Sequence, residues 1–217
     1  MTVGYAERAS AAYRASLAGL KVAVDVQHLY QEDKPNDRGA EFSLLDGSHV
    51  YEAGLATIYA ASIGHALAGR GAQVLANDPA HGIMVGHYWT RNRAANAWDA
   101  NLYLACHVNA GGGQYGLAEY MVGTSGSAVG AAIASQVQAD FPLLTGFRMG
   151  PIIRGQRGAV CIEAVDRWRA ALLLEPFFGD STRLEPMLAT PELVRLGVSI
   201  ADGIAAGYKR VGPPKAP

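Results

Sequence analysis

Residues 102–109 read Leu-Tyr-Leu-Ala-Cys-His-Val-Asn, an apolar run that ends in a histidine and an asparagine and precedes the glycines of residues 111–113. A short continuous apolar run bounded by turn-forming residues is typical of a buried strand. Such a strand delivers its last side chains to the edge of a sheet, where open α/β folds hold their ligands. Most buried histidines are simply bonded to a neighbour. A functional role for His107 therefore depends on whether other segments bring partners to the same edge.

Strand-like and helix-like segments alternate around this run. Residues 21–26, Lys-Val-Ala-Val-Asp-Val, alternate and are rich in β-branched side chains, which predicts the first strand. Ser48 can cap a helix that begins near Val50 and stops at the Gly-Arg-Gly of residues 69–71. The other predicted elements are strands at 72–76, 116–122 and 170–175, and helices at about 88–99, at 127–140 and from Pro191 through Ile204. This order predicts a single α/β domain with a mixed, mostly parallel sheet flanked by helices on both faces.

Two segments do not follow this alternation. Residues 29–47 are polar and rich in Pro, Gly and Asp, which indicates a long loop. A loop of this length in a compact domain is often functional. Residues 146–169 give the weakest pattern, and we expect one or two short strands there, around Ile152 and Val160.

Length and composition indicate one globular domain. The chain of 217 residues can bury one sizeable core. We place the domain at residues 20–210, between an N-terminal helical extension at 1–19 and a tail at 211–217. A hydrophobic content of 50% with only 17% charged residues argues against disorder. The net charge of −1 provides no overall attraction to nucleic acid or to an anionic membrane, so we expect neither as a partner.

Local signals bear on the compartment. The N-terminus carries Glu7, Arg8 and Arg14, and so lacks the uninterrupted apolar core of a signal peptide. No stretch is long and apolar enough to predict a transmembrane segment. Cys106 and Cys161 lie in apolar runs and form no CxxC pair, which favours small core residues in a reducing compartment. We expect synthesis in the cytoplasm without a Sec-type signal.

Chemically competent side chains recur at the ends of the predicted elements. The first strand leads to His28, the central one to His107 and a late one ends at Glu175, while Glu52 starts the helix after the long loop. Parallel strands place their carboxyl ends at one edge, together with helix N-termini. Two histidines and one glutamate form a His₂Glu zinc set, and a further glutamate can act as general base in hydrolysis. The pattern therefore predicts a single zinc ion at this edge.

Each of these residues also has a structural interpretation. Glu52 can be a surface glutamate that complements the helix dipole, His28 a loop residue, and Glu175 an ion-pair partner of a nearby arginine. No short HExxH-type spacing links the proposed ligands. The support comes from their joint occurrence at element ends.

These segments resemble the zinc-dependent N-acetylmuramoyl-L-alanine amidases, the peptidoglycan amidases of bacterial autolysins and phage endolysins. Val24-Asp25-Val26-Gln27-His28 resembles the family's Asp-Pro-Gly-His motif, and Asp37-Arg38-Gly39-Ala40 its following Asp-Pro-Gly-Ala. Further similarities lie at Glu52 with Leu55, at Arg91 with Ala95-Asn96, at residues 100–110 around His107, and at Leu172 to Phe178 around Glu175. The resemblance covers residues 20 to 208 in consistent order.

The resemblance implies a function and roles for these residues. It implies a mixed sheet between helices, and hydrolysis of the amide that joins N-acetylmuramic acid to L-alanine in peptidoglycan. His28, Glu52 and His107 would hold one Zn²⁺ ion and Glu175 would be the general base. Asn109, Asn96 and Arg91 are the expected substrate-binding residues. We expect a monomer that acts on the cell wall, as a phage or prophage endolysin.

The chain also departs from the family's pattern. Val26-Gln27 replaces the Pro-Gly before the first histidine, and Leu29-Tyr30 replaces the Gly-Gly after it. Phe177 stands in place of a glycine after the catalytic glutamate, and Cys106 in place of a small serine-like residue. The long loop leaves Glu41 as a competitor of Glu52 for the ligand position. Two alternatives therefore stay open: a zinc carboxypeptidase-like peptidase, and a catalytically degenerate domain that binds the wall.

Overall fold

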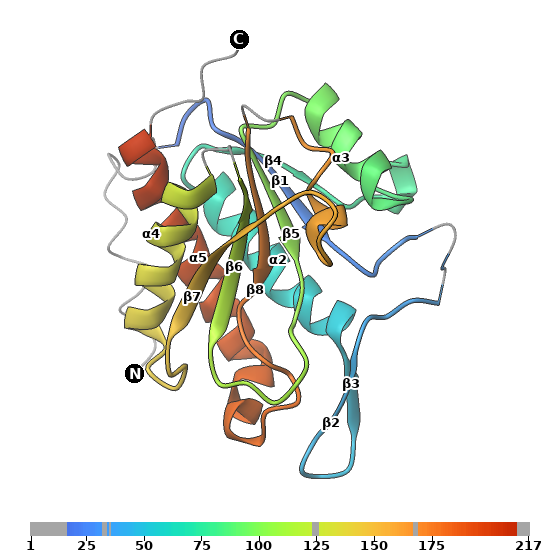
Figure 1. Ribbon diagram of the computed structural model, residues 1–217, viewed down its shortest axis with the longest axis vertical. Helices are drawn as coiled ribbons and strands as arrows, with labels where there is room; N and C mark the ends of the chain where they lie inside the picture. The colour runs from blue at the N-terminus through green and yellow to red at the C-terminus, as the bar shows by residue number, and fades with distance from the viewer. Residues whose placement is uncertain (1–16, 32–33, 35, 123–125, 167–168, 212–217) are drawn as a thin grey trace.

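The central sheet is built on the apolar runs of the sequence. The computed structural model of the chain describes residues 17–31, 34, 36–122, 126–166 and 169–211. Six strands form one sheet in the order β4-β1-β5-β8-β6-β7 (Figure 1). They are β1 (Lys21–Val26), β4 (Gln73–Ala76), β5 (Leu102–Cys106), β6 (Gly116–Met121), β7 (Phe147–Ile152) and β8 (Ala170–Glu175). Strands β4, β1, β5 and β8 are parallel, whereas β6 is antiparallel to β8 and pairs in parallel with β7. The predicted mixed, mostly parallel sheet is confirmed.

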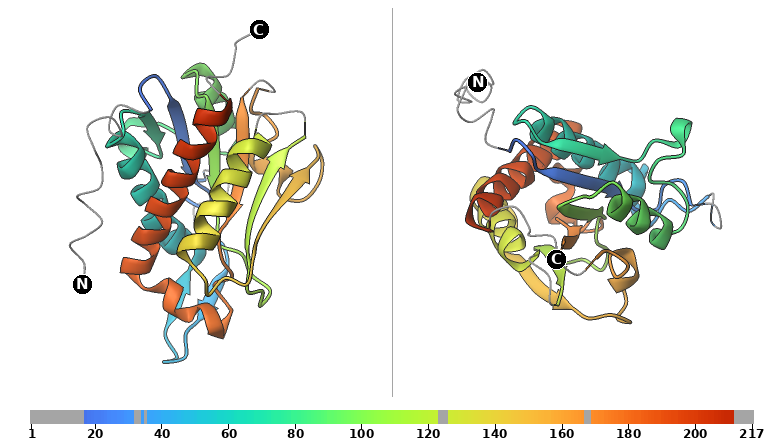
Figure 2. Two further views of the ribbon diagram at one scale, coloured as in Figure 1. Left: turned by 90° about the vertical axis from the view of Figure 1, so that its left-hand side faces the viewer. Right: turned by 90° about the horizontal axis from the view of Figure 1, so that it is seen from above.

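Helices cover both faces of this sheet. The helices α2 (Glu52–Ala68), α4 (Gly126–Asp140) and α5 (Thr190–Val211) pack on one face, and α3 (Tyr88–Ala97) lies on the other (Figures 1 and 2). Short 3₁₀ helices occur at η1 (Pro79–His81), η2 (Ala159–Cys161) and η3 (Thr182–Leu188). The alternation of each strand decides which side chains join which layer. In β5, Leu102, Leu104 and Cys106 pack toward α2 and α5, while Tyr103 and Ala105 pack toward α3 and η2.

The parallel strands bring several element ends to one edge. Leu174 pairs with Cys106, so Glu175 ends β8 at the level where His107 follows β5. Cys106 in turn pairs with Val26, the last residue of β1. The N-terminus of α2 reaches the same edge, because Glu52 accepts a hydrogen bond from the Val108 amide at 3.1 Å. The candidate site lies there.

The prediction that residues 29–47 form one long loop is wrong. This segment contains β2 (Glu41–Ser43), which pairs antiparallel with β3 (His49–Tyr51). Phe42 is the one fully buried side chain in these two strands, and its ring lies against the backbone of Gly179. Within the strand itself Phe42 is the one apolar residue, between Glu41 and Ser43, which is too weak a signal to predict a strand.

The predicted helix cap at Ser48 is also wrong. Ser48 lies in the hairpin, where its hydroxyl donates to Asp46 Oδ1 at 2.6 Å. Tyr51 occupies the N-cap position of α2 and makes no capping side-chain bond. The hairpin therefore uses the serine that the helix pattern would have taken as its cap.

Residues 146–169 match the prediction at one of two places. Ile152 ends the strand β7, as expected, but Val160 lies in the 3₁₀ helix η2, so the strand expected there is wrong. Gly158 adopts a φ of 87°, and the Cys161 amide donates back to its carbonyl at 3.0 Å, which closes a turn instead of extending the chain.

The two ends of the chain lie largely beyond the described residues. Most of the N-terminal helical extension expected at 1–19 falls there, as does the expected tail except Val211, which belongs to α5. Among the residues that the structure describes, no helix has the length and apolarity required to cross a lipid bilayer.

Candidate metal centre

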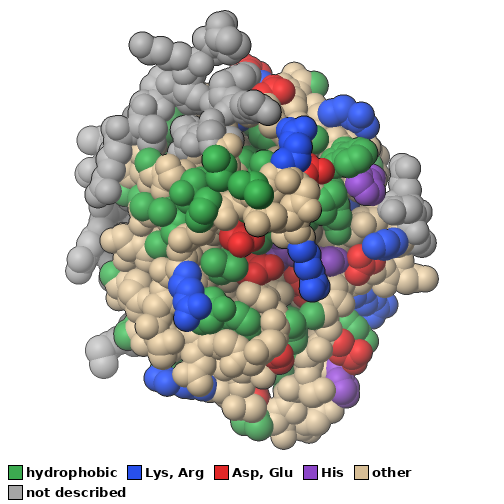
Figure 3. All heavy atoms as spheres, viewed as in Figure 1, with side chains coloured by type: hydrophobic (Ala, Val, Ile, Leu, Met, Phe, Trp, Pro, Cys, Tyr) green, Lys and Arg blue, Asp and Glu red, His purple; other side chains and the backbone are tan. Residues whose placement is uncertain are grey.

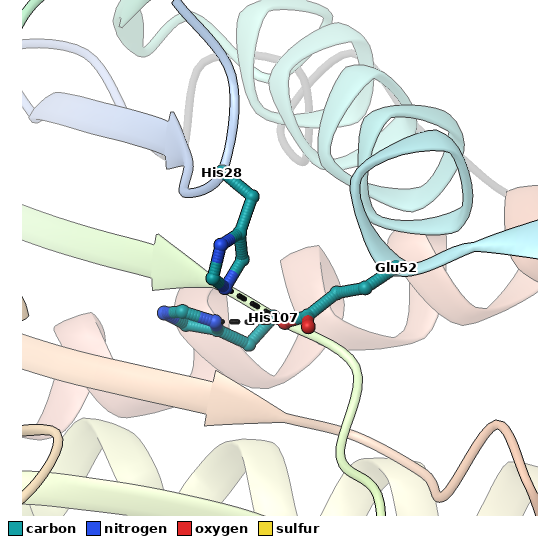
Figure 4. Close-up of side chains that lie close together, drawn as sticks. All are labelled: His28, Glu52 and His107. Atoms are coloured by element: carbon teal, nitrogen blue, oxygen red, sulfur yellow. Dashed lines mark hydrogen bonds and ion pairs between the residues drawn. The ribbon is translucent and has the colours of Figure 1, made fainter. Parts of the chain in front are cut away.

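Three side chains from three elements point toward one another at the carboxyl edge of the sheet. They are His28 after β1, Glu52 at the start of α2 and His107 after β5 (Figure 4). Glu52 Oε1 lies 2.8 Å from His107 Nδ1 and 3.5 Å from His28 Nε2. One donor atom from each of the three lies within 4.8 Å of the others. The geometry brings together the three residues that the sequence pattern selected as zinc ligands.

The backbone around Glu52 leaves room for its carboxylate. Gly39 has a φ of +72°, and a Cβ at this position would come within 2.4 Å of Glu52 Oε2. The next amide, that of Ala40, donates to the same oxygen at 3.0 Å. Burial raises the pKa of Glu52, but the hydrogen bond and charge of His107 and the charge of His28 outweigh burial and hold that pKa below its ordinary value. Glu52 is thus an anion at neutral pH.

His28 is oriented by a carboxylate on its outer nitrogen. Its Nδ1 lies 3.1 Å from Asp37 Oδ2, which leaves Nε2 facing Glu52. Asp37 is itself held by the Gly39 amide at 2.9 Å and the Gln31 side chain at 3.2 Å. Burial raises the pKa of Asp37, but the Gly39 amide and His28 outweigh it and lower that pKa. A carboxylate behind a histidine fixes the ring and increases its basicity as a metal ligand.

His107 is held from several sides. Its amide donates to the Leu174 carbonyl at 2.9 Å, and its own carbonyl accepts the hydroxyl of the buried Tyr59 at 2.7 Å. Its Nε2 lies 3.6 Å from the Cys161 sulfur, so Nδ1 is the nitrogen directed at Glu52. Because β5, β8 and α2 all contribute, the ring position depends on the assembled core.

The donor set fits a zinc ion. Two imidazole nitrogens and one carboxylate oxygen are the ligands of catalytic zinc sites that keep a fourth position open. Each histidine offers one nitrogen to the centre, while its other nitrogen faces Asp37 or Cys161. Within the described ranges, His28, Glu52 and His107 form the one such group of His, Cys, Asp or Glu side chains.

A further carboxyl group, that of Glu175, lies close enough to this centre to feel the charge of Glu52. Glu175 ends β8 and is partly buried. Burial, then the negative charges of Glu119 and Glu52, raise its pKa to about 7, although Arg157 acts in the opposite direction. Acidic and histidine side chains gather near the middle of this face of the molecule (Figure 3). A carboxyl group with a pKa near neutrality can both accept and return a proton.

Glu41 and three further histidines, His49, His81 and His87, lie apart from this centre. Glu41 is on β2, half exposed, and pairs with His49 at 3.2 Å. His81 pairs with Asp78 at 2.6 Å on the surface, and His87 is the exposed N-cap of α3. The structure thus brings Glu52, and not Glu41, to the two histidines.

The three residues expected to bind substrate differ in setting. Asn109 is partly exposed beyond the end of β5, and its side chain accepts the Ala110 amide at 2.8 Å. Asn96 is bonded to the Ala164 carbonyl at 2.9 Å and ties α3 to the segment after η2. Arg91 is fully buried. Of the three, Asn109 is the one with a side chain at the open edge of the sheet.

Several residues of the site were not predicted from the sequence to lie there. Asp37 opens the Asp37-Arg38-Gly39-Ala40 motif, and this motif is the one sequence signal that points to its place beside His28. Cys161 looked like a core residue, which it also is, with 4% of its surface exposed. Glu119 carried no local signal, because its closeness to Glu175 follows from the antiparallel pairing of Leu117 with that residue.

Comparison with known proteins shows the fold. No protein-family model matches the chain, and no curated protein matches it in sequence. Among solved structures, the N-acetylmuramyl-L-alanine amidase Ami1 from Mycobacterium smegmatis superposes with a TM-score of 0.69 at 14% identity, over 89% of this chain and 99% of that one. The N-acetylmuramoyl-L-alanine amidase AmiC2 of Nostoc punctiforme gives a TM-score of 0.63 at 17% identity, over 89% and 97%.

A third similar structure belongs to a longer protein. Cwp6 from Clostridium difficile gives a TM-score of 0.67 at 18% identity over 86% of this chain, which spans 29% of Cwp6. At these identities, the property that the chain shares with the three proteins is the fold.

Proposed function

We propose that the protein is a zinc-dependent hydrolase that cleaves the amide bond between N-acetylmuramic acid and L-alanine in peptidoglycan. The observation that carries this proposal is the convergence of His28, Glu52 and His107, with donor atoms within 4.8 Å of one another. Glu175 beside them and the fold shared with two amidases support it. Peptidoglycan is accordingly the proposed substrate, and Zn²⁺ the proposed cofactor.

The residues of the chain divide the chemistry between them. Zinc, when bound, supplies Lewis acidity that polarises a carbonyl and lowers the pKa of a water molecule to about 7. His28 and His107 would hold it with Nε2 and Nδ1, and Glu52 would supply the negative charge. A carboxylate of Glu175 would take the proton of the attacking water and return it to the nitrogen of L-alanine as the amide bond breaks. Asp37 and Cys161 would keep the two imidazole rings in their orientations.

Mass spectrometry of digested muropeptides tests the reaction. An amidase releases intact stem peptides free of muramic acid. The same donor set also serves zinc peptidases, and a carboxypeptidase would instead shorten peptides that stay attached to sugar, which would contradict the proposal. A domain that only binds the wall would leave the muropeptides unchanged, and this outcome would also contradict the proposal.

Replacing Glu119 with glutamine should shift the acidic limb of the pH profile of kcat/KM to lower pH. Glu175 acts as a base only when ionised, and after burial the negative charge of Glu119 is the largest influence that raises its pKa. Removing that charge favours the ionised form of Glu175. We therefore expect the rise of kcat/KM with increasing pH to occur at a pH about half a unit lower than in the wild type. The matched control is Glu192→Gln on α5, which removes the same charge beside Arg195 and should not move the limb. A limb that stays in place or moves upward would contradict this interaction.

The cellular role is a separate question. We propose that the protein acts on the cell wall, and the expectation of a monomeric phage or prophage endolysin stays a prediction. Addition of the purified protein to peptidoglycan sacculi and to intact cells, with turbidity as the measurement, tests the lytic role, and sedimentation tests the oligomeric state.

A further inference from the structure

One buried guanidinium spans the turn that carries His28. Arg91 on α3 is fully buried. Its Nη1 donates to Asp25 Oδ1 at 2.9 Å and to the Val26 carbonyl at 3.0 Å, and its Nη2 donates to the Leu29 carbonyl. These two carbonyls lie on either side of Gln27 and His28. Arg91 therefore binds the backbone before and after the proposed zinc ligand.

The turn that Arg91 spans has an unfavourable backbone conformation. His28 has a φ of 35° and Tyr30 a φ of 56°, both in the left-handed region that disfavours side chains other than glycine. The Leu29 amide folds back onto the Gln27 carbonyl. Neither His28 nor Tyr30 is a glycine, which could adopt this conformation without the cost. Contacts from elsewhere must therefore hold the turn.

Asp25 fixes the guanidinium in place. It is fully buried one residue before the end of β1 and accepts hydrogen bonds from Arg91, the Asn77 side-chain amide at 2.8 Å, the Tyr103 hydroxyl and the Gln27 side chain. A buried charge is stable only when paired and hydrogen-bonded. Arg91 Nε also donates to the Gly86 carbonyl at 2.8 Å, and the Gly86 amide donates to the Tyr30 carbonyl at 2.8 Å. The turn, β1 and the start of α3 are thus joined through one side chain.

We propose that Arg91 is a positioning residue for His28, and not a substrate-binding residue. Its guanidinium is committed to the carboxylate and carbonyls around the turn, and none of its surface is exposed for a substrate. The planar fork of arginine can reach both carbonyls and the carboxylate at once, whereas a lysine ammonium is a single point of charge. This inference rests on the proposed zinc site only for the consequence of misplacing His28.

The test compares Arg91→Lys with a matched control, Arg169→Lys. Arg169 is 4% exposed, and likewise donates to backbone carbonyls, those of Asn96 and Ala100, and to the carboxylates of Asp99 and Asp166. It precedes the first residue of β8, at the opposite edge of the sheet from the site. Both substitutions keep a buried positive charge and replace a planar guanidinium with a single ammonium group, so a purely structural effect should appear in both variants.

Two measurements distinguish the variants. Hydrogen exchange of peptides that cover residues 26–31 and Gly86 should become at least about tenfold faster in Arg91→Lys and stay as in the wild type in Arg169→Lys. Zinc affinity, from competition with a chromophoric chelator, should fall by about 10- to 100-fold in Arg91→Lys alone. Equal exchange and equal zinc affinity in the two variants would overturn the proposal.

Further variants cover the remaining outcomes. Tyr30 is exposed and has a left-handed backbone conformation, which glycine adopts without cost, so Tyr30→Gly relieves strain in the turn. In the Arg91→Lys background it should restore part of the zinc affinity, and no recovery would count against the proposal. If Arg91→Lys does not fold, Asp25→Asn, which keeps the shape but not the charge, should show the same local exchange. If the wild type binds no zinc, the proposed function fails, while the exchange measurement still decides the role of Arg91.

Discussion

Glu175→Gln should lower the rate of muropeptide hydrolysis by about 100- to 10,000-fold, the usual contribution of a general base, while the protein stays folded and retains its zinc. Glutamine keeps the shape of the side chain at the end of β8 but cannot accept a proton. The carboxyl group it replaces has a pKa of about 7, raised first by burial and then by Glu119 and Glu52. The measurement is the initial rate of stem-peptide release at saturating zinc, together with metal content by atomic spectroscopy.

The matched control for this variant is Glu41→Gln. Glu41 is the glutamate that the sequence left as an alternative ligand, and it lies on the hairpin beside His49. We expect this variant to keep both zinc and activity. A Glu175→Gln protein with near wild-type turnover would exclude Glu175 as the base, and one that loses its zinc would make Glu175 a ligand.

The elements with local side-chain patterns were predictable from sequence. Strands β5 and β8 are almost continuous apolar runs because both faces of a central strand are covered, and β1 is rich in valine; such patterns appear without any knowledge of the pairing. Their parallel order places His28, His107 and Glu175 at one edge. For the same reason, the meeting of His28, Glu52 and His107 could be expected from their positions at element ends.

The contacts that hold the site were not predictable in this way. Arg91 lies more than sixty residues from the turn that it binds, and a fully buried arginine looks the same in sequence as an exposed one. Glu119 approaches Glu175 because β6 runs antiparallel to β8, and the expectation of a mixed sheet does not indicate which strand runs antiparallel. The hairpin β2–β3 packs on the domain through Phe42 and Val50, and the Leu45 amide donates to Glu185. Each of these depends on contacts between distant segments.

His107→Ala should remove the metal centre. A zinc site with three protein ligands loses one of them, so the loss of affinity should exceed the roughly 10- to 100-fold that follows from changing an outer partner of a ligand. Glu52 would still accept the Ala40 and Val108 amides at 3.0 and 3.1 Å, so the carboxylate stays in place and the fold should survive. The expected result is a folded protein that lacks zinc and activity.

Thermal unfolding with and without zinc measures this loss directly. An ion that binds only the folded state stabilises it by RT ln(1 + [L]/Kd), about 4 kcal/mol at a thousand times Kd. If His107→Ala weakens binding 100-fold, the same zinc concentration contributes only about 1.4 kcal/mol, so most of the zinc-induced rise in Tm should disappear. The control is His49→Ala, a half-exposed histidine on the hairpin, which should keep the full rise. His107 Nδ1 lies 2.8 Å from Glu52 and is one of the three donors of the proposed centre. An unchanged zinc response in His107→Ala would therefore mean that the metal binds elsewhere and that the centre proposed at this edge is wrong.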